Sequence, residues 1–328
     1  MSQLRRCLVS GRWVIISPKR DARPVDFQCP ADIVNGRDRC PFCLGQEEKT
    51  PPPVMVVPGK PGGPWLVRVV PNKYPALEGL GDPVFEHEGI YQKMPSVGVH
   101  EVIVEGSDHD IHLRDLSQTH AVEVIRAYIK RLRELACDKR IAYTMIFKNH
   151  GRSAGASLAH PHSQLAGFPM VPFDVEQESQ GAHRYRQEYG VCVWCAINKQ
   201  EIQEHSRLID EDDGYVLSAP YASRIPFEMS LVPKRHEARF ELMDDPAGLA
   251  RFLQKALRRL DTALKNPAYN LIVHTAPAHA YNEDAFHWHI EILPKIAHIA
   301  GFEWGSGLYI NTVAPETAAE WLRQVKLS

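Results

Sequence analysis

The stretch that decides the fold is Ala159-His160-Pro161-His162-Ser163-Gln164, which follows a run of small residues from Ser153 to Ser157. In an extended chain, side chains two residues apart point to the same side. We therefore expect His160 and His162 to face one site, with Gln164 next along the row. A neutral imidazole can ligate a metal or attack phosphorus, and a glutamine amide can hydrogen-bond a phosphoryl oxygen. The alternative is two polar residues on an ordinary edge strand.

A second histidine pair, His287-Trp288-His289, closes a segment that is arranged like the first and predicts an internal repeat. In each copy a strand reaches a single histidine, His109 or His236, and is followed by a helix with apolar residues at helical spacing, a buried strand and the histidine-pair strand. The order predicts a duplicated α+β fold with two antiparallel sheets and helices packed on them. The predicted segments are strands at 99–104 and 226–232, helices at 116–137 and 246–264, and strands at 141–147 and 268–273, in halves of 1–180 and 181–328.

Two Cys-x-x-Cys pairs occupy matching places in the two copies. Two cysteines spaced in this way form half of a tetrahedral metal site, and the histidines that define the repeat can supply the other half. We therefore predict two zinc ions per chain. The alternative for either pair is a reduced, buried dithiol, and a redox role is disfavoured because no βαβ pattern surrounds either pair. The predicted ligand sets are Cys40, Cys43, His109 and His160, and Cys192, Cys195, His236 and His287.

Composition narrows the class of protein. The 328 residues can bury a large core, and a net charge of -2 gives no general attraction to nucleic acid or to membranes. The apolar stretch at 8–16 is interrupted by polar residues and is too short for a signal peptide or a spanning helix. We expect a cytoplasmic enzyme.

The run 149–164, Asn-His-Gly-Arg-Ser-Ala-Gly-Ala-Ser-Leu-Ala-His-Pro-His-Ser-Gln, resembles the active-site signature of galactose-1-phosphate uridylyltransferases, the nucleotidyl-transferring branch of the histidine-triad superfamily. Segments 17–24, 40–43, 72–77, 287–289 and 301–303 are similar to the same family. The resemblance implies a duplicated histidine-triad-like fold. It also implies a ping-pong transfer of a nucleoside monophosphate through a histidine.

By this resemblance His162 is the nucleophile that attacks the α-phosphorus of UDP-glucose, expels glucose 1-phosphate and then passes UMP to galactose 1-phosphate. Gln164 would hydrogen-bond the transferring phosphoryl group. The implied partners are a nucleotide sugar, a hexose 1-phosphate and a second copy of the chain in a homodimer. The resemblance implies substrate contacts for Arg20, Arg23, Asn72, Asn149, Gly155 and Ser157, and for Phe302 and Glu303 on the hexose side.

Several details resemble instead the relatives that act on ADP-sugars, including ADP-glucose phosphorylase and adenylyltransferases. Ser163 stands where many uridylyltransferases have glycine, Lys73 stands where many have aspartate, and the C-terminal run contains Gly-Ser-Gly at 305–307. We expect uridylyl transfer as the first candidate activity and adenylyl transfer as the alternative. Two rival functions are a histidine-triad nucleotide hydrolase and a non-catalytic, zinc-stabilised nucleotide sensor. The hexose-side segment argues against the first, and the complete His-Pro-His-Ser-Gln run argues against the second.

The second metal site has an alternative as well. Some relatives carry an iron-type site of one glutamate and three histidines, which Glu178, His274, His287 and His289 would match here. The cysteine pair and His236 favour the zinc set. The second copy also has Glu291 where the first has Gln164, and a glutamate would repel a polyphosphate. We therefore expect one active site per chain, with His289 in a structural or substrate-edge role.

Overall fold

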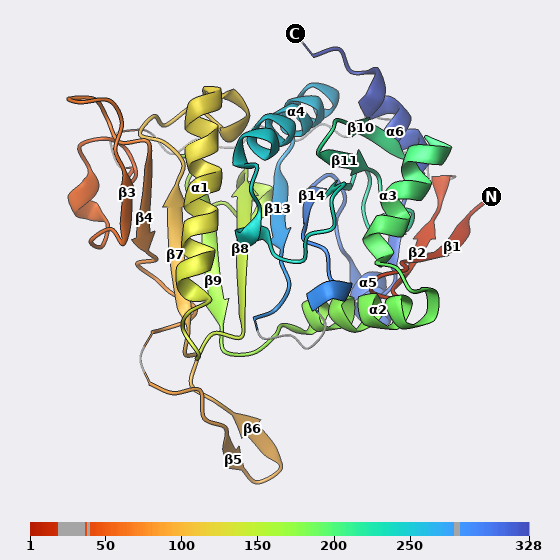
Figure 1. Ribbon diagram of the computed structural model, residues 1–328, viewed down its shortest axis with the longest axis horizontal. Helices are drawn as coiled ribbons and strands as arrows, with labels where there is room; N and C mark the ends of the chain where they lie inside the picture. Colours follow the sequence, from red (N-terminus) through yellow and green to blue (C-terminus); the bar gives the residue numbers. More distant parts are fainter. Residues whose placement is uncertain (19–36, 38–39, 80, 279–282, 328) are drawn as a thin grey trace.

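The computed structural model describes residues 1–18, 37, 40–79, 81–278 and 283–327, and its centre is a ten-stranded antiparallel sheet (Figure 1). In order across this sheet the strands are Leu208–Glu211 (β10), Tyr215–Ser218 (β11), Met229–Pro233 (β12), His289–Pro294 (β14), Tyr269–His274 (β13), Tyr143–His150 (β8), His162–Phe168 (β9), Val99–Val104 (β7), Val67–Pro71 (β4) and Met55–Val57 (β3).

The internal repeat is visible in this order. One half contributes β7, β8 and β9 with helix α1 (Gln118–Leu135), and the other contributes β12, β13 and β14 with helix α4 (Pro246–Leu264). The predicted α+β architecture is confirmed. The two expected antiparallel sheets join edge to edge, because β8 pairs with β13 and places Ile146 opposite Val273.

Helices α1 and α4 lie side by side over one face of the sheet and bury its apolar side (Figure 1). α4 has the predicted bounds, with Asp245 accepting a hydrogen bond from the Gly248 N–H and Pro246 in the first turn. α1 is shorter than predicted because the Ser117 side chain accepts from the His120 N–H and begins the helix there. The sheet residues of this core include Val69, Ile103, Leu165, Leu271 and Ile292.

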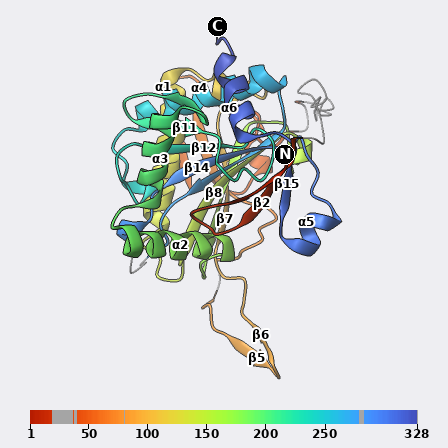
Figure 2. The same cartoon turned by 90° about the vertical axis from the view of Figure 1, so that its right-hand side faces the viewer.

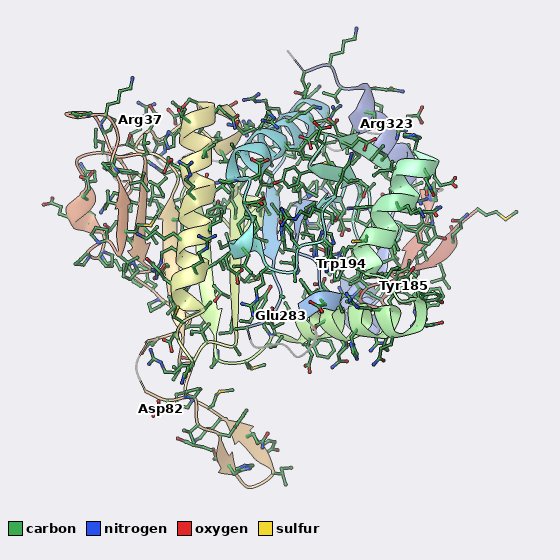
Figure 3. The ribbon with its side chains drawn as sticks, in the orientation of Figure 1. Arg37, Asp82, Tyr185, Trp194, Glu283 and Arg323 are labelled. Carbon is green, nitrogen blue, oxygen red and sulfur yellow. The ribbon has the colours of Figure 1, made fainter. Side chains whose placement is uncertain are left out.

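Other elements pack on the side of the second half that carries Val232, His274 and His289, which is opposite to the core under α4. Figures 1 and 2 show these elements around the second half of the sheet. They are α2 (Phe173–Tyr189), α3 (Val193–Glu204) and a three-stranded sheet of β1 (Gln3–Arg6), β2 (Trp13–Ile16) and β15 (Tyr309–Asn311). β1 and β2 are antiparallel, whereas β15 runs parallel to β2. Tyr185 of α2 and Trp194 of α3 lie close together where the two helices meet (Figure 3), and Trp194 packs against Phe286 in a small apolar core.

The remaining elements are peripheral. A hairpin of β5 (Glu86–Glu88) and β6 (Tyr91–Lys93) projects from the body of the molecule (Figure 1), and two short helices, α5 (Gly301–Ser306) and α6 (Pro315–Gln324), lie near the C-terminus. Among the helices that the structure describes, none has both the length and the apolar character that crossing a membrane requires. In the part of the chain that the structure describes, the 3-10 helices are Glu47–Lys49, Leu113–Asp115, Arg152–Ala154, Phe240–Leu242 and Glu283–Ala285.

Candidate active site and metal centres

The candidate nucleophile His162 is the first residue of β9 and is nearly buried, at 6% exposure. Its Nδ1 lies 2.8 Å from the carbonyl oxygen of His160. Because a carbonyl oxygen only accepts, the proton of a neutral ring sits on Nδ1, and the lone pair of Nε2 is left for attack. Burial lowers the pKa of His162 below its usual 6.5, so the ring is neutral at pH 7.

Gln164 lies two residues further along β9, on the same side as His162. Its Oε1 is 2.9 Å from Nε2 of His100, and the Ala76 N–H donates to Nδ1 of the same imidazole at 3.1 Å. His100 therefore donates from Nε2, which fixes the Gln164 oxygen toward β7 and leaves its amide group to donate to a substrate. His100 has no motif spacing, so it was missed in the sequence. The pairing of β7 with β9 would have pointed to it. Val102 lies opposite Gln164, and His100, two residues before Val102, lies on the same face.

The small-residue run between β8 and β9 forms a tight loop that carries two of the predicted substrate residues, Gly155 and Ser157, and lies next to a third, Asn149 of β8. Gly155 adopts a φ of +92°, a conformation that disfavours side chains. A Cβ there would lie 3.4 Å from Nδ2 of Asn149. Asn270 of the second half donates to both the Asn149 side chain and the Ala154 carbonyl at 2.8 Å, which ties the loop to β13. Ser157 is exposed in the same loop.

The structure brings together only part of the predicted substrate set. Asn72, just after β4, has its Nδ2 at 3.2 Å from His100 Nε2 and so lies next to Gln164. Phe302 and Glu303 lie on α5 in the second half, away from β9 (Figures 1 and 2), where Glu303 accepts a hydrogen bond from the Ala300 N–H. Arg20 and Arg23 lie outside the described residues.

The first predicted metal set is assembled immediately beside His162. Cys40, Cys43, His109 and His160 place their ligand atoms within 4.8 Å of one another. Cys43 Sγ lies 3.3 Å from His109 Nδ1 and 3.6 Å from His160 Nδ1. His160 donates from Nε2 to the Gly106 carbonyl at 2.8 Å, which leaves Nδ1 free for a metal. Two thiols and two imidazoles are the donor set typical of structural zinc.

The second predicted set is also assembled. Cys192 is the N-cap residue of α3 and Cys195 lies in its first turn, while His236 follows β12 and His287 precedes β14. Cys195 Sγ is 3.6 Å from Nδ1 of both His236 and His287. The two Cys-x-x-Cys knuckles therefore occupy equivalent places in the two halves.

The iron-type alternative is corrected by the structure, because His287 belongs to the cysteine cluster. Glu178, His274 and His289 instead meet Glu291, which takes the fourth place. His274 Nδ1 lies 3.1 Å from Glu178, and its Nε2 lies 3.5 Å from Glu291. In the sequence-based prediction, the zinc set and the iron-type set both required His287. In the structure His287 joins the cysteines, and a separate cluster forms with Glu291 in its place.

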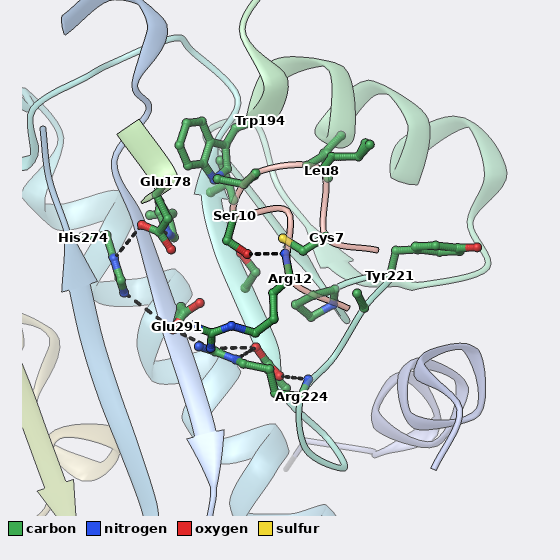
Figure 4. Close-up of a pocket in the computed structure, with 18 of the residues that line it drawn as sticks. Cys7, Leu8, Ser10, Arg12, Glu178, Trp194, Tyr221, Arg224, His274 and Glu291 are labelled. Carbon is green, nitrogen blue, oxygen red and sulfur yellow. Dashed lines mark hydrogen bonds and ion pairs between the residues drawn. The ribbon is translucent and has the colours of Figure 1, made fainter. Parts of the chain in front are cut away.

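This third cluster forms the floor of a cavity of about 730 Å³ between the sheet, α2, α3 and the N-terminal strands (Figure 4). Arg224 donates to Glu291 at 2.7 Å and to Glu228 at 2.8 Å. Although burial lowers it, the carboxylates of Glu178 and Glu291 raise the pKa of His274 to about 10. Arg224 and a protonated His274 therefore offset part of the negative charge of Glu178, Glu228 and Glu291. Glu291 is therefore committed to partners within the protein.

Comparison with known proteins agrees with this geometry. Residues 66–172 match the family model described as galactose-1-phosphate uridyl transferase, N-terminal domain. The ADP-glucose phosphorylase of Arabidopsis thaliana is 36% identical over 334 residues, covering 99% of this chain and 93% of that protein. A galactose-1-phosphate uridylyltransferase of Thermotoga maritima is 28% identical over 341 residues, covering 100% and 99%. A crystal structure of an Arabidopsis thaliana ADP-glucose phosphorylase with bound ADP-glucose superposes with a TM-score of 0.86 at 33% identity, covering all of both chains.

A duplicated α+β sheet with a His-Pro-His-Ser-Gln strand in one half defines the class as a nucleotidyltransferase of the histidine-triad superfamily. Within that class, the chain belongs to the galactose-1-phosphate uridylyltransferase family.

Proposed function

We propose that the chain transfers a nucleoside monophosphate from a nucleotide sugar through a covalent intermediate on His162. The observation that carries the proposal is the hydrogen bond from His162 Nδ1 to the His160 carbonyl, which leaves Nε2 as a neutral nucleophile. Nε2 attacks the α-phosphorus, the bond to the sugar-phosphate oxygen breaks, and the sugar 1-phosphate departs. An acceptor phosphate oxygen then attacks the same phosphorus and releases the imidazole.

The donor proposed here is ADP-glucose and the acceptor is inorganic phosphate, so that the products are glucose 1-phosphate and ADP. The support is the 36% identity to an ADP-glucose phosphorylase along nearly the whole chain. This reverses the order expected from the sequence, which placed UDP-glucose and galactose 1-phosphate first. Uridylyl transfer is the second candidate, supported by the match to the uridylyltransferase family model and by the Thermotoga relative.

Zinc is the metal proposed for the two Cys2His2 clusters, in a structural role. Each cluster offers four protein ligands, which fills a tetrahedral shell and leaves no position for substrate. In the first half, such an ion would fix His160 and through its carbonyl the ring of His162. We also propose that the protein acts in the cytoplasm as a homodimer.

The experiment that separates the two donors compares kcat/KM for ADP-glucose and UDP-glucose, each with phosphate, glucose 1-phosphate and galactose 1-phosphate as acceptors. The ratio measures the difference in transition-state binding. We expect ADP-glucose with phosphate to win by at least about tenfold, a difference of about 1.4 kcal/mol. A preference for UDP-glucose with galactose 1-phosphate would establish the second candidate instead.

A further inference from the structure

A fully buried polar network lies beneath His162, on the face of the sheet that α1 covers. Lys148 of β8 donates to Glu105 at 2.8 Å and to the backbone carbonyl of His162 at 3.1 Å. Ser163 donates to the other oxygen of Glu105 at 2.5 Å, and its hydroxyl lies 2.6 Å from that of Tyr128. None of these four side chains is more than 3% exposed.

The backbone of Glu105 and Gly106 also holds the chain around the nucleophile. The Glu105 N–H donates to the Pro161 carbonyl at 3.1 Å, and the Gly106 carbonyl accepts from His160 at 2.8 Å. Together with Lys148 and the Glu105 side chain, these contacts reach every residue from His160 to Ser163. The chain that carries the nucleophile is thus held at each residue from His160 to Ser163, and the side chains of Lys148, Glu105 and Ser163 hold it from the face that α1 covers.

The second half provides an internal comparison. β12, β13 and β14 pair as β7, β8 and β9 do, with Glu291 in the place of Gln164. In this alignment the positions of Glu105, Lys148 and Ser163 correspond to Pro233, Val273 and Ile290, and all three of these residues are buried and apolar. The fold therefore forms here without the ion pair.

Buried ion pairs seldom stabilise a protein more than apolar residues of similar volume, because both charges lose their hydration. An ion pair present in only one of two equivalent halves therefore calls for a reason other than stability. The carbonyl that Lys148 holds belongs to the candidate nucleophile itself.

We propose that Lys148 and Glu105 are positioning residues for His162, which hold its backbone so that Nε2 stays in line with the α-phosphorus of the bound nucleotide sugar. This inference rests on the proposed covalent function. It also assigns Ser163 to the network, where its side chain points away from the substrate side and so does not read the nucleobase.

The test replaces both charges at once, as K148M/E105Q, so that neither partner is left buried and alone. The matched control is R131M/E101Q, which removes the buried ion pair between Arg131 of α1 and Glu101 of β7. Glu101 lies opposite Leu165 rather than beneath His162. For each protein one measures the rate of nucleotidyl-His162 formation from ADP-glucose and UDP-glucose by rapid quench, the KM for the donor and the melting temperature.

We expect K148M/E105Q to fold and to keep the donor KM within about twofold, while adduct formation slows by at least about tenfold and up to about a hundredfold, since small misplacements of reacting groups have effects of this size. The control is expected to form the adduct at the wild-type rate. Equal rates in wild type and K148M/E105Q, or an equal loss in the control, would overturn the inference.

If K148M/E105Q does not fold, Ser163→Ala replaces it as the test. We then expect the rate of adduct formation to fall by at least about threefold at unchanged KM. An unchanged rate in that variant would also overturn the inference. Absence of an adduct in the wild-type protein with either donor would instead refute the proposed function on which the inference rests.

Discussion

Two histidines in equivalent positions of the two halves differ in their charged neighbours. His289 Nδ1 lies 3.0 Å from the His287 carbonyl, as His162 Nδ1 lies 2.8 Å from that of His160. Burial lowers the pKa of His289 to about 4, so both rings are neutral at pH 7. His289 Nε2, however, lies 4.0 Å from the Glu178 carboxylate. An anionic phosphate is disfavoured there by the nearby carboxylates.

This difference predicts the outcome of an exchange between the halves. Gln164→Glu introduces the residue of the second half beside His162, where its charge repels the phosphoryl group and no amide donor remains. We expect kcat/KM for the nucleotide sugar to fall by about a hundredfold or more. Glu291→Gln is the matched control and should leave transfer within about twofold of wild type. Steady-state kinetics of both variants check this, and equal effects would contradict the separation of the two sites.

The Glu105 carboxyl predicts a specific dependence of stability on pH. Burial raises its pKa, but the charge of Lys148 and the hydrogen bonds from Lys148 and Ser163 outweigh burial and hold it below the usual 4.5. A carboxyl with a lowered pKa in the folded state stabilises the fold above its unfolded pKa, and this contribution is lost as the pH falls through the folded pKa.

We therefore expect the unfolding free energy of the wild-type protein to fall more steeply below about pH 4.5 than that of K148M/E105Q. Urea denaturation of both proteins at a series of acidic pH values measures the difference. Parallel curves would show that Glu105 carries no such contribution.

At the scale of elements, the repeated order of strand, helix, strand and histidine pair was predictable, because amphipathic helices and buried strands leave periodic patterns. The α4 bounds agree with the sequence for this reason. The assembly of the two Cys-His clusters was predictable from spacing and repeat symmetry together. The joining of the two sheets was not, because the pairing of Ile146 with Val273 depends on contacts between distant strands with no local signal. The same holds for the place of Glu291 beside His274 and for the buried partners of Lys148.

The two cysteine clusters predict separable metal contents. The wild-type protein should contain two zinc ions per chain, and Cys43→Ser and Cys192→Ser should each retain one, because the clusters share no ligand. Structural zinc typically contributes on the order of 10 kcal/mol to the folding free energy of small domains. Cys43→Ser should slow nucleotidyl transfer more than Cys192→Ser, because only the first cluster includes His160.

Elemental analysis of the purified variants gives these counts. Iron in the wild-type protein that persists in Cys192→Ser would assign a metal to Glu178, His274, His289 and Glu291 instead.

At the scale of the whole molecule, the hairpin of β5 and β6 carries exposed apolar residues, with Ile90 at 90% and Tyr91 at 72% exposure. A two-stranded hairpin is marginally stable alone, and exposed apolar patches often mark interfaces. We predict that a second copy of the chain covers this hairpin, which would give a homodimer of twice 37.1 kDa.

Light scattering after size exclusion measures this mass directly. Ile90→Asp should shift the protein toward the monomer, whereas Leu242→Asp, at another exposed apolar residue, should not. A wild-type protein that is monomeric at micromolar concentration would contradict the prediction.

Two features define the proposed chemistry of the whole molecule: one active half in a duplicated chain, and His162 as the residue that carries the nucleotidyl group. The most direct measurement is the intact mass and peptide map of the protein after incubation with ADP-glucose or UDP-glucose in the absence of an acceptor. We predict one nucleotidyl group per chain, located on His162, lost on addition of phosphate or a hexose 1-phosphate and absent from His162→Asn. An adduct on His289 or any other residue, or full turnover by His162→Asn, would contradict the role of His162.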